Sequence, residues 1–273
     1  MEYLKVILYG VIEGITEWLP ISSTGHLILA EKLLALPYPE EFLSMFRVVI
    51  QLGAILAVVV LYFPRLWPFT TDPRHKYQRP AVWQLWFKIF AATLPALVLG
   101  LLLDDWLDAH LYNYITVAAM LILYGVFFIL IENRRRRPTV RRLDQLTYKH
   151  ALIIGCWQVL AMIPGTSRSG ATIVGGLLLG LARPVAAEFT FFLAIPVMAG
   201  ASGLKLVKYL AEGGRFSGGE VTALALGCAV AFVVSVAAIR FLVTFVQKHN
   251  FKVFGWYRIA LGAVVLAAAL LGF

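Results

Sequence analysis

Apolar residues form long runs along the whole chain, separated by short polar stretches. A helix that crosses a bilayer needs about 20 predominantly apolar residues. Ten apolar segments can be delimited, and six of them approach this length. They cover residues 3–19, 26–36, 44–63, 86–103, 111–131, 150–163, 171–181, 189–210, 221–246 and 253–272. The pattern therefore predicts an all-α polytopic membrane protein.

The four shorter segments form two pairs, each interrupted by proline, glycine and hydroxyl residues. The first break reads LPISSTGH (residues 19–26) and the second reads IPGTSRSGAT (residues 163–172). Non-helical backbone is tolerated at membrane depth only where it is buried in protein or lines a wet cavity. We therefore expect two re-entrant hairpins whose tips meet inside the protein.

The two halves of the chain, each containing one break, have the same order of segments. Each break is followed by a short helix, a span that begins with Phe, and two further spans. An odd number of crossings per half makes the second half enter the membrane from the opposite side. We expect one integral membrane domain over residues 1–273, built from two inverted-topology repeats, each a re-entrant broken hairpin plus three transmembrane helices. The repeats cover about 1–131 and 150–273, with a basic connection at 132–149.

Composition supports a membrane location and charge indicates an orientation. Hydrophobic residues make up 60% and charged residues 14% of the 273 residues, whereas soluble domains carry about 25% charged residues. Much of the net charge of +9 lies in the 132–149 connection, which we expect on the cytoplasmic side. Its arginines are Arg134, Arg135, Arg136, Arg137, Arg141 and Arg142. No aromatic or folded motif accompanies them, so we expect no nucleic-acid partner.

Other charged residues test this orientation. Arg65, Arg74, Lys76 and Arg79 lie in a predicted 64–87 loop, on the same side as the arginine connection. The acidic residues between the next two spans are expected in an outer loop: Asp104, Asp105 and Asp108. Three basic residues on the outer side oppose the scheme: Lys205, Lys208 and Arg215.

Two carboxylates and one arginine lie close to the breaks. Glu13 and Glu17 are one helical turn apart, so a helix places both on one face. With Arg168, they would cost roughly 9 kcal/mol at the bilayer centre if all three were unpaired. Two neighbouring carboxylates repel unless a proton or cation lies between them. We expect Glu13 and Glu17 to hold a divalent cation, Mg²⁺ or Ca²⁺, together with phosphate oxygens.

The second break has the chemistry of a phosphate site. Arg168 offers a planar, permanently charged group that can bind two phosphate oxygens. Ser167, Ser169 and Gly170 allow the backbone to curl and expose N–H groups before a helix, and Thr172 adds a hydroxyl one turn later. Small hydroxyl residues also pack membrane helices, so the arginine is what favours phosphate binding.

A hydroxyl and an imidazole lie in the first break. Ser23 and His26 are three residues apart and can share a helix face. A hydroxyl beside an imidazole permits nucleophilic attack assisted by proton transfer. Two alternatives stay open, namely that His26 is an inert hydrogen-bonded residue and that an activated water attacks in place of Ser23.

The quoted motifs resemble those of the undecaprenyl-pyrophosphate phosphatases, the UppP/BacA family of bacterial inner membranes. The resemblance extends over the whole chain and is carried by EGITE (13–17), LPISSTGH (19–26) and PGTSRSGAT (164–172). It implies hydrolysis of undecaprenyl pyrophosphate to the monophosphate carrier lipid of peptidoglycan synthesis, with a divalent cation, a site open to the periplasmic side, and bacitracin resistance. The implied functional residues are Glu13, Glu17, Ser23, His26, Ser167, Arg168 and Thr172.

The residues alone leave a second class of function open. Inverted repeats with broken helices are transporter architecture, so a transporter or flippase of a phosphorylated lipid is the alternative. The set of Ser23, His26 and two glutamates favours hydrolysis, because transport of a phosphate group does not require it. The sequence leaves open whether the chain acts as a monomer or a homodimer.

Overall fold

The structure is a computed structural model that describes residues 2–69, 79–134 and 137–271. Helices dominate it, and an isolated β-bridge joins Val140 to Leu181. The predicted all-α class is confirmed. The α-helices are α1 (Glu2–Thr16), α2 (Ser23–Leu33), α3 (Glu40–Val49), α4 (Gln51–Leu61), α5 (Phe63–Leu66), α6 (Arg79–Leu111), α7 (Tyr114–Asn133), α8 (Tyr148–Val159), α9 (Arg168–Leu178), α10 (Arg183–Ala211), α11 (Gly218–Lys248) and α12 (Lys252–Leu270).

Six stretches are long and apolar enough to cross a bilayer, as the sequence predicts. Three follow the first break and three follow the second. They are Glu40–Leu61, Pro80–Leu103, Tyr114–Asn133, Arg183–Ala211, Gly218–Lys248 and Lys252–Leu270. Their outward faces expose large apolar side chains, for example Leu102 (73% exposed) and Val233 (65%). Exposed apolar surface of this extent indicates contact with lipid, so the chain is a multi-pass membrane protein.

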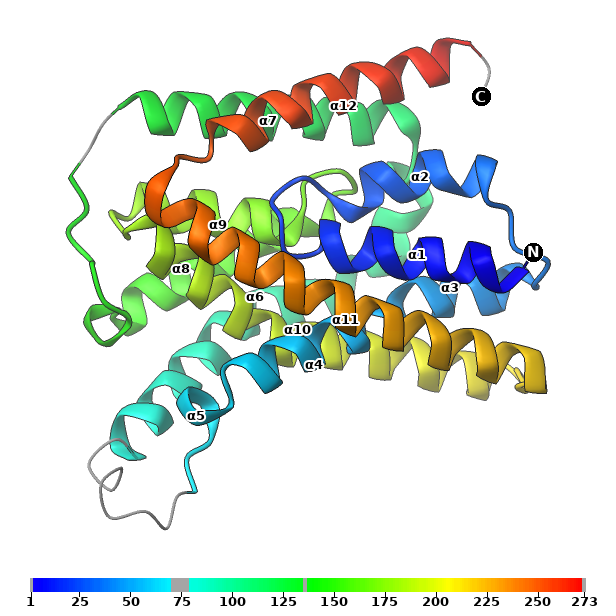
Figure 1. Cartoon of the computed structure of the whole chain (residues 1–273), viewed down its shortest axis with the longest axis horizontal. Helices are drawn as coiled ribbons and strands as arrows, with labels where there is room; N and C mark the ends of the chain where they lie inside the picture. The colour runs from blue at the N-terminus through cyan, green and yellow to red at the C-terminus, as the bar shows by residue number, and fades with distance from the viewer. Residues whose placement is uncertain (1, 70–78, 135–136, 272–273) are drawn as a thin grey trace.

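Each half packs its broken helix pair against the other half. Helix α1 lies along α11, and α8 lies along α6; α2 contacts α12, and α9 contacts α7. Helices α7 and α12, the last spans of the two halves, run side by side (Figure 1). This exchange brings the residues that follow the two breaks to the same part of the molecule.

Glycines allow the closest of these contacts. A Cβ on Gly53 of α4 would lie 2.0 Å from the carbonyl oxygen of Cys228 on α11. A Cβ on Gly155 of α8 would lie 2.3 Å from the carbonyl oxygen of Ala92 on α6. Small residues let membrane helices approach at backbone distance, where van der Waals packing replaces the hydrophobic effect.

Two predicted loops are wrong in extent. Helix α6 runs from Arg79 to Leu111, so Asp104, Asp105 and Asp108 lie within it rather than in a loop. The helix continues because no strong breaker follows until Asn113, whose side chain caps α7 by accepting from the Thr116 N–H (2.9 Å). The predicted 64–87 loop is likewise shorter, since α5 and the first turns of α6 occupy part of it. Of its basic residues, Arg74 and Lys76 lie outside the described residues.

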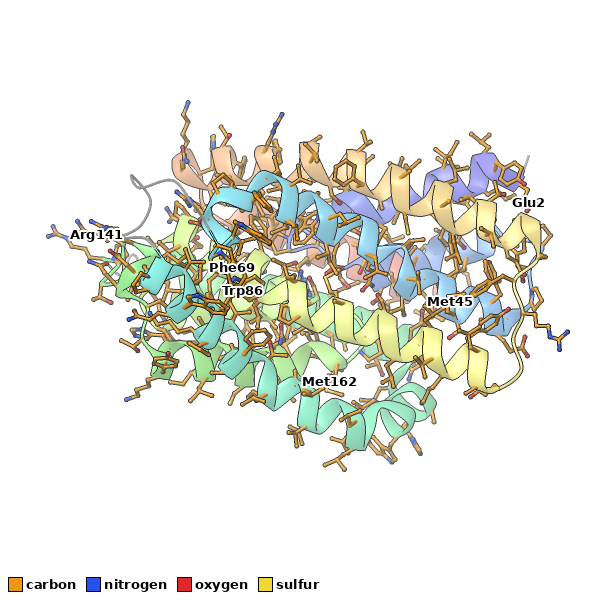
Figure 2. All side chains as sticks on the ribbon, turned by 90° about the horizontal axis from the view of Figure 1, so that it is seen from below. Glu2, Met45, Phe69, Trp86, Arg141 and Met162 are labelled. Atoms are coloured by element: carbon orange, nitrogen blue, oxygen red, sulfur yellow. The ribbon has the colours of Figure 1, made fainter. Side chains whose placement is uncertain are left out.

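The long axis separates two ends of different character. Figure 2 shows Arg141, from the arginine-rich connection, at one end and Glu2 at the other. Helix α7 leads directly to the 132–149 connection, so the basic charge of this connection lies at the end of that span.

Candidate active site

The two breaks form matching turns. Ser22 and Ser167 precede α2 and α9 with φ of 73° and 70°, the positive-φ non-glycine residues of the described chain. Their hydroxyls accept from the N–H of Gly25 (3.3 Å) and Gly170 (3.2 Å), capping helices of equal length. These caps start both helices three residues earlier than predicted. Strained backbone of this kind persists only where the surroundings hold it.

Arg168 and Glu17 join the two turns. The Arg168 Nε and Nη2 atoms both lie 3.1 Å from Glu17 Oε1, and the side chains are only 10% and 9% exposed. Nη1 of Arg168 donates to the Thr190 carbonyl (3.0 Å) on α10, and the guanidinium lies 5.7 Å from the Trp18 ring. The predicted meeting of the two breaks is therefore present in this ion pair, which fixes the arginine in one orientation.

Ser23 contacts Glu17 rather than His26. Its Oγ donates to Glu17 Oε2 (3.4 Å). His26 Nδ1 is 2.7 Å from the Ser22 carbonyl, which can only accept, so Nε2 accepts from the Tyr257 hydroxyl (2.7 Å). Both imidazole nitrogens are thus engaged away from Ser23. The carboxylate of Glu17 is the basic group that the structure places beside this hydroxyl.

Glu13 is fully buried one turn before Glu17. Neither of its carboxylate oxygens has a hydrogen-bond partner among the described residues. An unpaired buried carboxylate is costly, and a cation would relieve that cost. Within the described residues no group of three or more His, Cys, Asp or Glu side chains gathers, so Glu13 and Glu17 offer two protein ligands. Two carboxylates fit a hard cation that takes its other oxygens from phosphate and water.

A cavity of about 1010 Å³ opens beside these residues. Glu17, Ser23, Ser167 and Arg168 line its inner part. Its rim lies near the start of α3 and the end of α6, at the side of α7 opposite the arginine connection, and includes Glu40, Arg47, Tyr112 and Lys205. Apolar residues from α6 and α10 complete the wall, among them Leu97, Leu101, Val197 and Leu204. The cavity thus combines a charged end with an apolar wall.

Three residues of the predicted phosphate site lie behind this wall. Thr172 donates to the Arg168 carbonyl (2.9 Å) and accepts from the Thr190 hydroxyl (2.8 Å). Ser169 donates to the Leu19 carbonyl (3.4 Å), and the Gly170 N–H is taken by the Ser167 cap. These bonds hold the second turn against the first and against α10. A direct contact of Ser169, Gly170 or Thr172 with phosphate stays a prediction.

Comparison with known proteins identifies the family. The family model "Bacitracin resistance protein BacA" matches residues 6–264. The chain belongs to this family. It is 55% identical over 264 residues to an undecaprenyl-diphosphatase of Enterococcus faecalis, covering 96% of this chain and 95% of that one. It is 56% identical over 269 residues to the undecaprenyl-diphosphatase of Desulfitobacterium hafniense, covering 97% and 95% respectively.

Two polar residues near the site of this BacA-family chain were not predicted from the sequence. Arg258, a charge within the apolar span α12, is fully buried between the two turns. A single arginine in such a span is a signal that could have singled it out. Gln158 on α8 lines the cavity, and its buried amide has no hydrogen-bond partner among the described residues. An uncharged amide gives a weaker signal, because glutamine also occurs at helix contacts in membranes.

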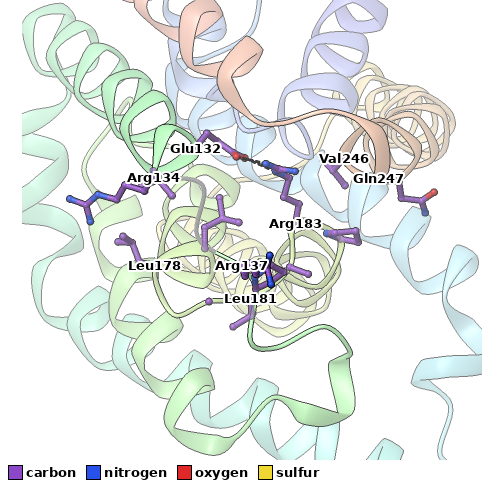
Figure 3. Close-up of a pocket in the computed structure, with 14 residues that line it drawn as sticks. Glu132, Arg134, Arg137, Leu178, Leu181, Arg183, Val246 and Gln247 are labelled. Carbon is purple, nitrogen blue, oxygen red and sulfur yellow. Dashed lines mark hydrogen bonds and ion pairs between the residues drawn. The ribbon is translucent and has the colours of Figure 1, made fainter.

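A second cavity of about 260 Å³ lies near the arginine connection (Figure 3). Its one carboxylate, Glu132, is held by Arg183 through bonds of 2.8 and 2.5 Å, and Arg134 points away from that pair. The C-terminal ends of α7, α9 and α11 border it, so the arginines stabilise the negative ends of helix dipoles. This cavity lacks a free acid–base group among its described lining residues, which leaves the larger cavity as the candidate active site.

Proposed function

We propose that this chain hydrolyses undecaprenyl pyrophosphate to undecaprenyl phosphate and inorganic phosphate. The observation that carries the proposal is the convergence of a carboxylate (Glu17), a hydroxyl (Ser23) and a guanidinium (Arg168) from two broken hairpins at one cavity. Membership of the BacA family and the similarity to undecaprenyl-diphosphatases support it. Hydrolysis would return the carrier lipid to peptidoglycan synthesis and would reduce the pyrophosphate form that bacitracin captures.

Ser23 is the proposed nucleophile. Its Oγ attacks the terminal phosphorus while its proton passes to Glu17 Oε2, the nearest carboxylate oxygen. The bond from this phosphorus to the bridging oxygen breaks, and the lipid monophosphate leaves. Water then attacks the phosphoserine, and the bond from phosphorus to Ser23 Oγ breaks. The departing Oγ takes back the proton from Glu17, which restores the Ser23 hydroxyl and the Glu17 carboxylate, and both protons of the water leave with the inorganic phosphate. Direct attack by a water next to Glu17 is the alternative, and the acid–base role of His26 stays a prediction.

Arg168 and a divalent cation would stabilise the phosphoryl charge. The guanidinium is held by Glu17 and the Thr190 carbonyl, so it is already oriented before charge develops in the transition state. We propose that Glu13 and Glu17 hold Mg²⁺ or Ca²⁺, which would neutralise the pyrophosphate oxygens. The two unpaired oxygens of Glu13 support this assignment.

The architecture proposed is that of two inverted repeats. The reciprocal packing of α1 on α11 and α8 on α6, and the matching caps at Ser22 and Ser167, support it. We place the arginine connection in the cytoplasm and the cavity rim on the outer side of the bacterial inner membrane. The site residues come from one chain, so catalysis does not require a homodimer.

The assay that tests the function uses purified protein in detergent with polyprenyl pyrophosphate and Mg²⁺. Hydrolysis predicts release of one inorganic phosphate per lipid and its loss when a chelator removes the divalent cation. A transporter or flippase would leave the pyrophosphate intact. Absence of phosphate release with every divalent cation tried, from protein shown to be folded, would contradict the proposal.

A further inference from the structure

Arg258 occupies an unusual place in the protein. It belongs to α12, far from both turns in the chain, yet its guanidinium is fully buried where the turns meet. No carboxylate lies within ion-pair distance of it among the described residues. A buried charge without a counter-ion is expensive, so a role in packing alone does not account for an arginine at this position.

Its bonds run to backbone carbonyls of both turns. Nη1 donates to the Pro20 carbonyl (3.2 Å) in the first turn. Nη2 donates to the carbonyls of Gly165 (2.9 Å) and Thr166 (2.8 Å) in the second turn. Weaker contacts reach α7 at the carbonyls of Met120 (3.4 Å) and Leu121 (3.5 Å). One rigid planar group thus joins the segments that immediately precede the two capping serines.

We infer that Arg258 is a positioning residue that sets the spacing between the two turns, and so the placement of Ser23 and Arg168 around the phosphate. This inference rests on the proposed function. The carbonyls of Pro20, Gly165 and Thr166 belong to buried residues outside the helices, so Arg258 supplies hydrogen bonds that no helix ladder provides there. A displacement of about 1 Å between catalytic groups can lower the rate on the order of 100-fold, so this bond network would act on kcat.

Gly170 provides an independent way to disturb the same contact. A Cβ on Gly170 would lie 3.0 Å from Arg258 Nη1, so Gly170→Ala must push the guanidinium by a few tenths of an ångström. The shorter lysine side chain of Arg258→Lys keeps the charge but lacks the planar fork. If Gly170→Ala acts through the guanidinium, its effect should therefore shrink when Arg258→Lys is already present.

The experiment measures kcat, KM and Tm of purified Arg258→Lys, Gly170→Ala and the double variant, with polyprenyl pyrophosphate and Mg²⁺. Arg258→Lys should lower kcat by about tenfold or more with KM within about twofold, and Gly170→Ala should lower kcat by about threefold. The double variant should match Arg258→Lys. Arg240→Lys, an exposed arginine of the neighbouring span α11, is the control and should match the unchanged protein.

Three results would overturn the inference while leaving the proposed function intact. They are a folded Arg258→Lys protein with kcat within about twofold of the unchanged protein, losses that multiply in the double variant, or a kcat loss that only follows the folded fraction. If Arg258→Lys does not fold, Gly170→Ala alone decides, and unchanged kcat overturns the inference. No phosphate release by the unchanged protein would overturn the proposed function and this inference together.

Discussion

The turn before α2 and the turn before α9 have the same backbone conformation at the helix cap but carry different side chains. Both place a serine at positive φ as the helix cap, and both caps bind the N–H three residues on. The residue after the cap is Ser23 in the first turn and Arg168 in the second. The same type of capped turn therefore places the proposed nucleophile, Ser23, on one side of the site and the positively charged Arg168 on the other.

The difference between the turns explains why neither suffices alone. The first turn carries Glu17 and Ser23, which suit proton transfer and attack, but the Glu17 carboxylate repels a phosphate. The second turn carries Arg168, which attracts phosphate but cannot accept a proton. Their ion pair at 3.1 Å brings the two functions to one cavity.

Ser23→Ala should have the largest effect, with kcat reduced by about 1000-fold or more, because the proposed nucleophile is removed. Phosphate release and a phosphoserine trap at low pH provide the measurements. Ser44→Ala is a control, since it removes a hydroxyl on the same cavity wall. Near-normal turnover by Ser23→Ala would instead assign the attack to water.

Arg168→Lys should lower kcat by about 100-fold with normal abundance, because a lysine ammonium cannot bind two phosphate oxygens in a fixed plane. Arg168→Ala should be worse. The comparison is made on protein that elutes as a single folded species. Full activity in Arg168→Lys would mean that the second turn contributes only a point charge.

Glu13→Gln should raise the divalent-cation concentration for half-maximal activity by about tenfold, because one of two charged ligands is lost. A titration of Mg²⁺ at saturating lipid measures this shift. A lowered rate with unchanged cation dependence would remove Glu13 from the metal site and give it a different role.

Ser22→Ala and Ser167→Ala should each lower the stability of the folded protein by a small and similar amount. Each removes one helix cap, which stabilises a protein by about 1 kcal/mol. Thermal unfolding in detergent should show similar decreases in Tm for the two variants. A large decrease for one and none for the other would contradict the equivalence of the two turns.

The spans and the two breaks could be predicted because they depend on long apolar runs and on clustered breakers. The earlier start of α2 and α9 could not, since serine at positive φ is rare and its residue type does not encode it. The length of α6 was missed because its acidic residues were interpreted as a loop, whereas the helix continues to Leu111.

The sequence predicted which residues belong to the site better than it predicted which atoms they contact. The helical spacing of Ser23 and His26 suggested that the two side chains form a pair. The imidazole instead forms a hydrogen bond with Tyr257, which is distant in the chain. The partners of Arg258 are backbone carbonyls of three separate segments, which no residue pattern identifies. The pairing of Glu17 with Arg168 was expected only in outline, as a meeting of two hairpin tips.

The central claim is that Glu17 of the first turn and Arg168 of the second act as one unit. The most direct measurement is kcat for phosphate release by Glu17→Gln, Arg168→Lys and the double variant, with Arg240→Lys as the control. Residues that act together give non-additive losses, so the double variant should be within about tenfold of the worse single variant. Losses that multiply would contradict the shared site.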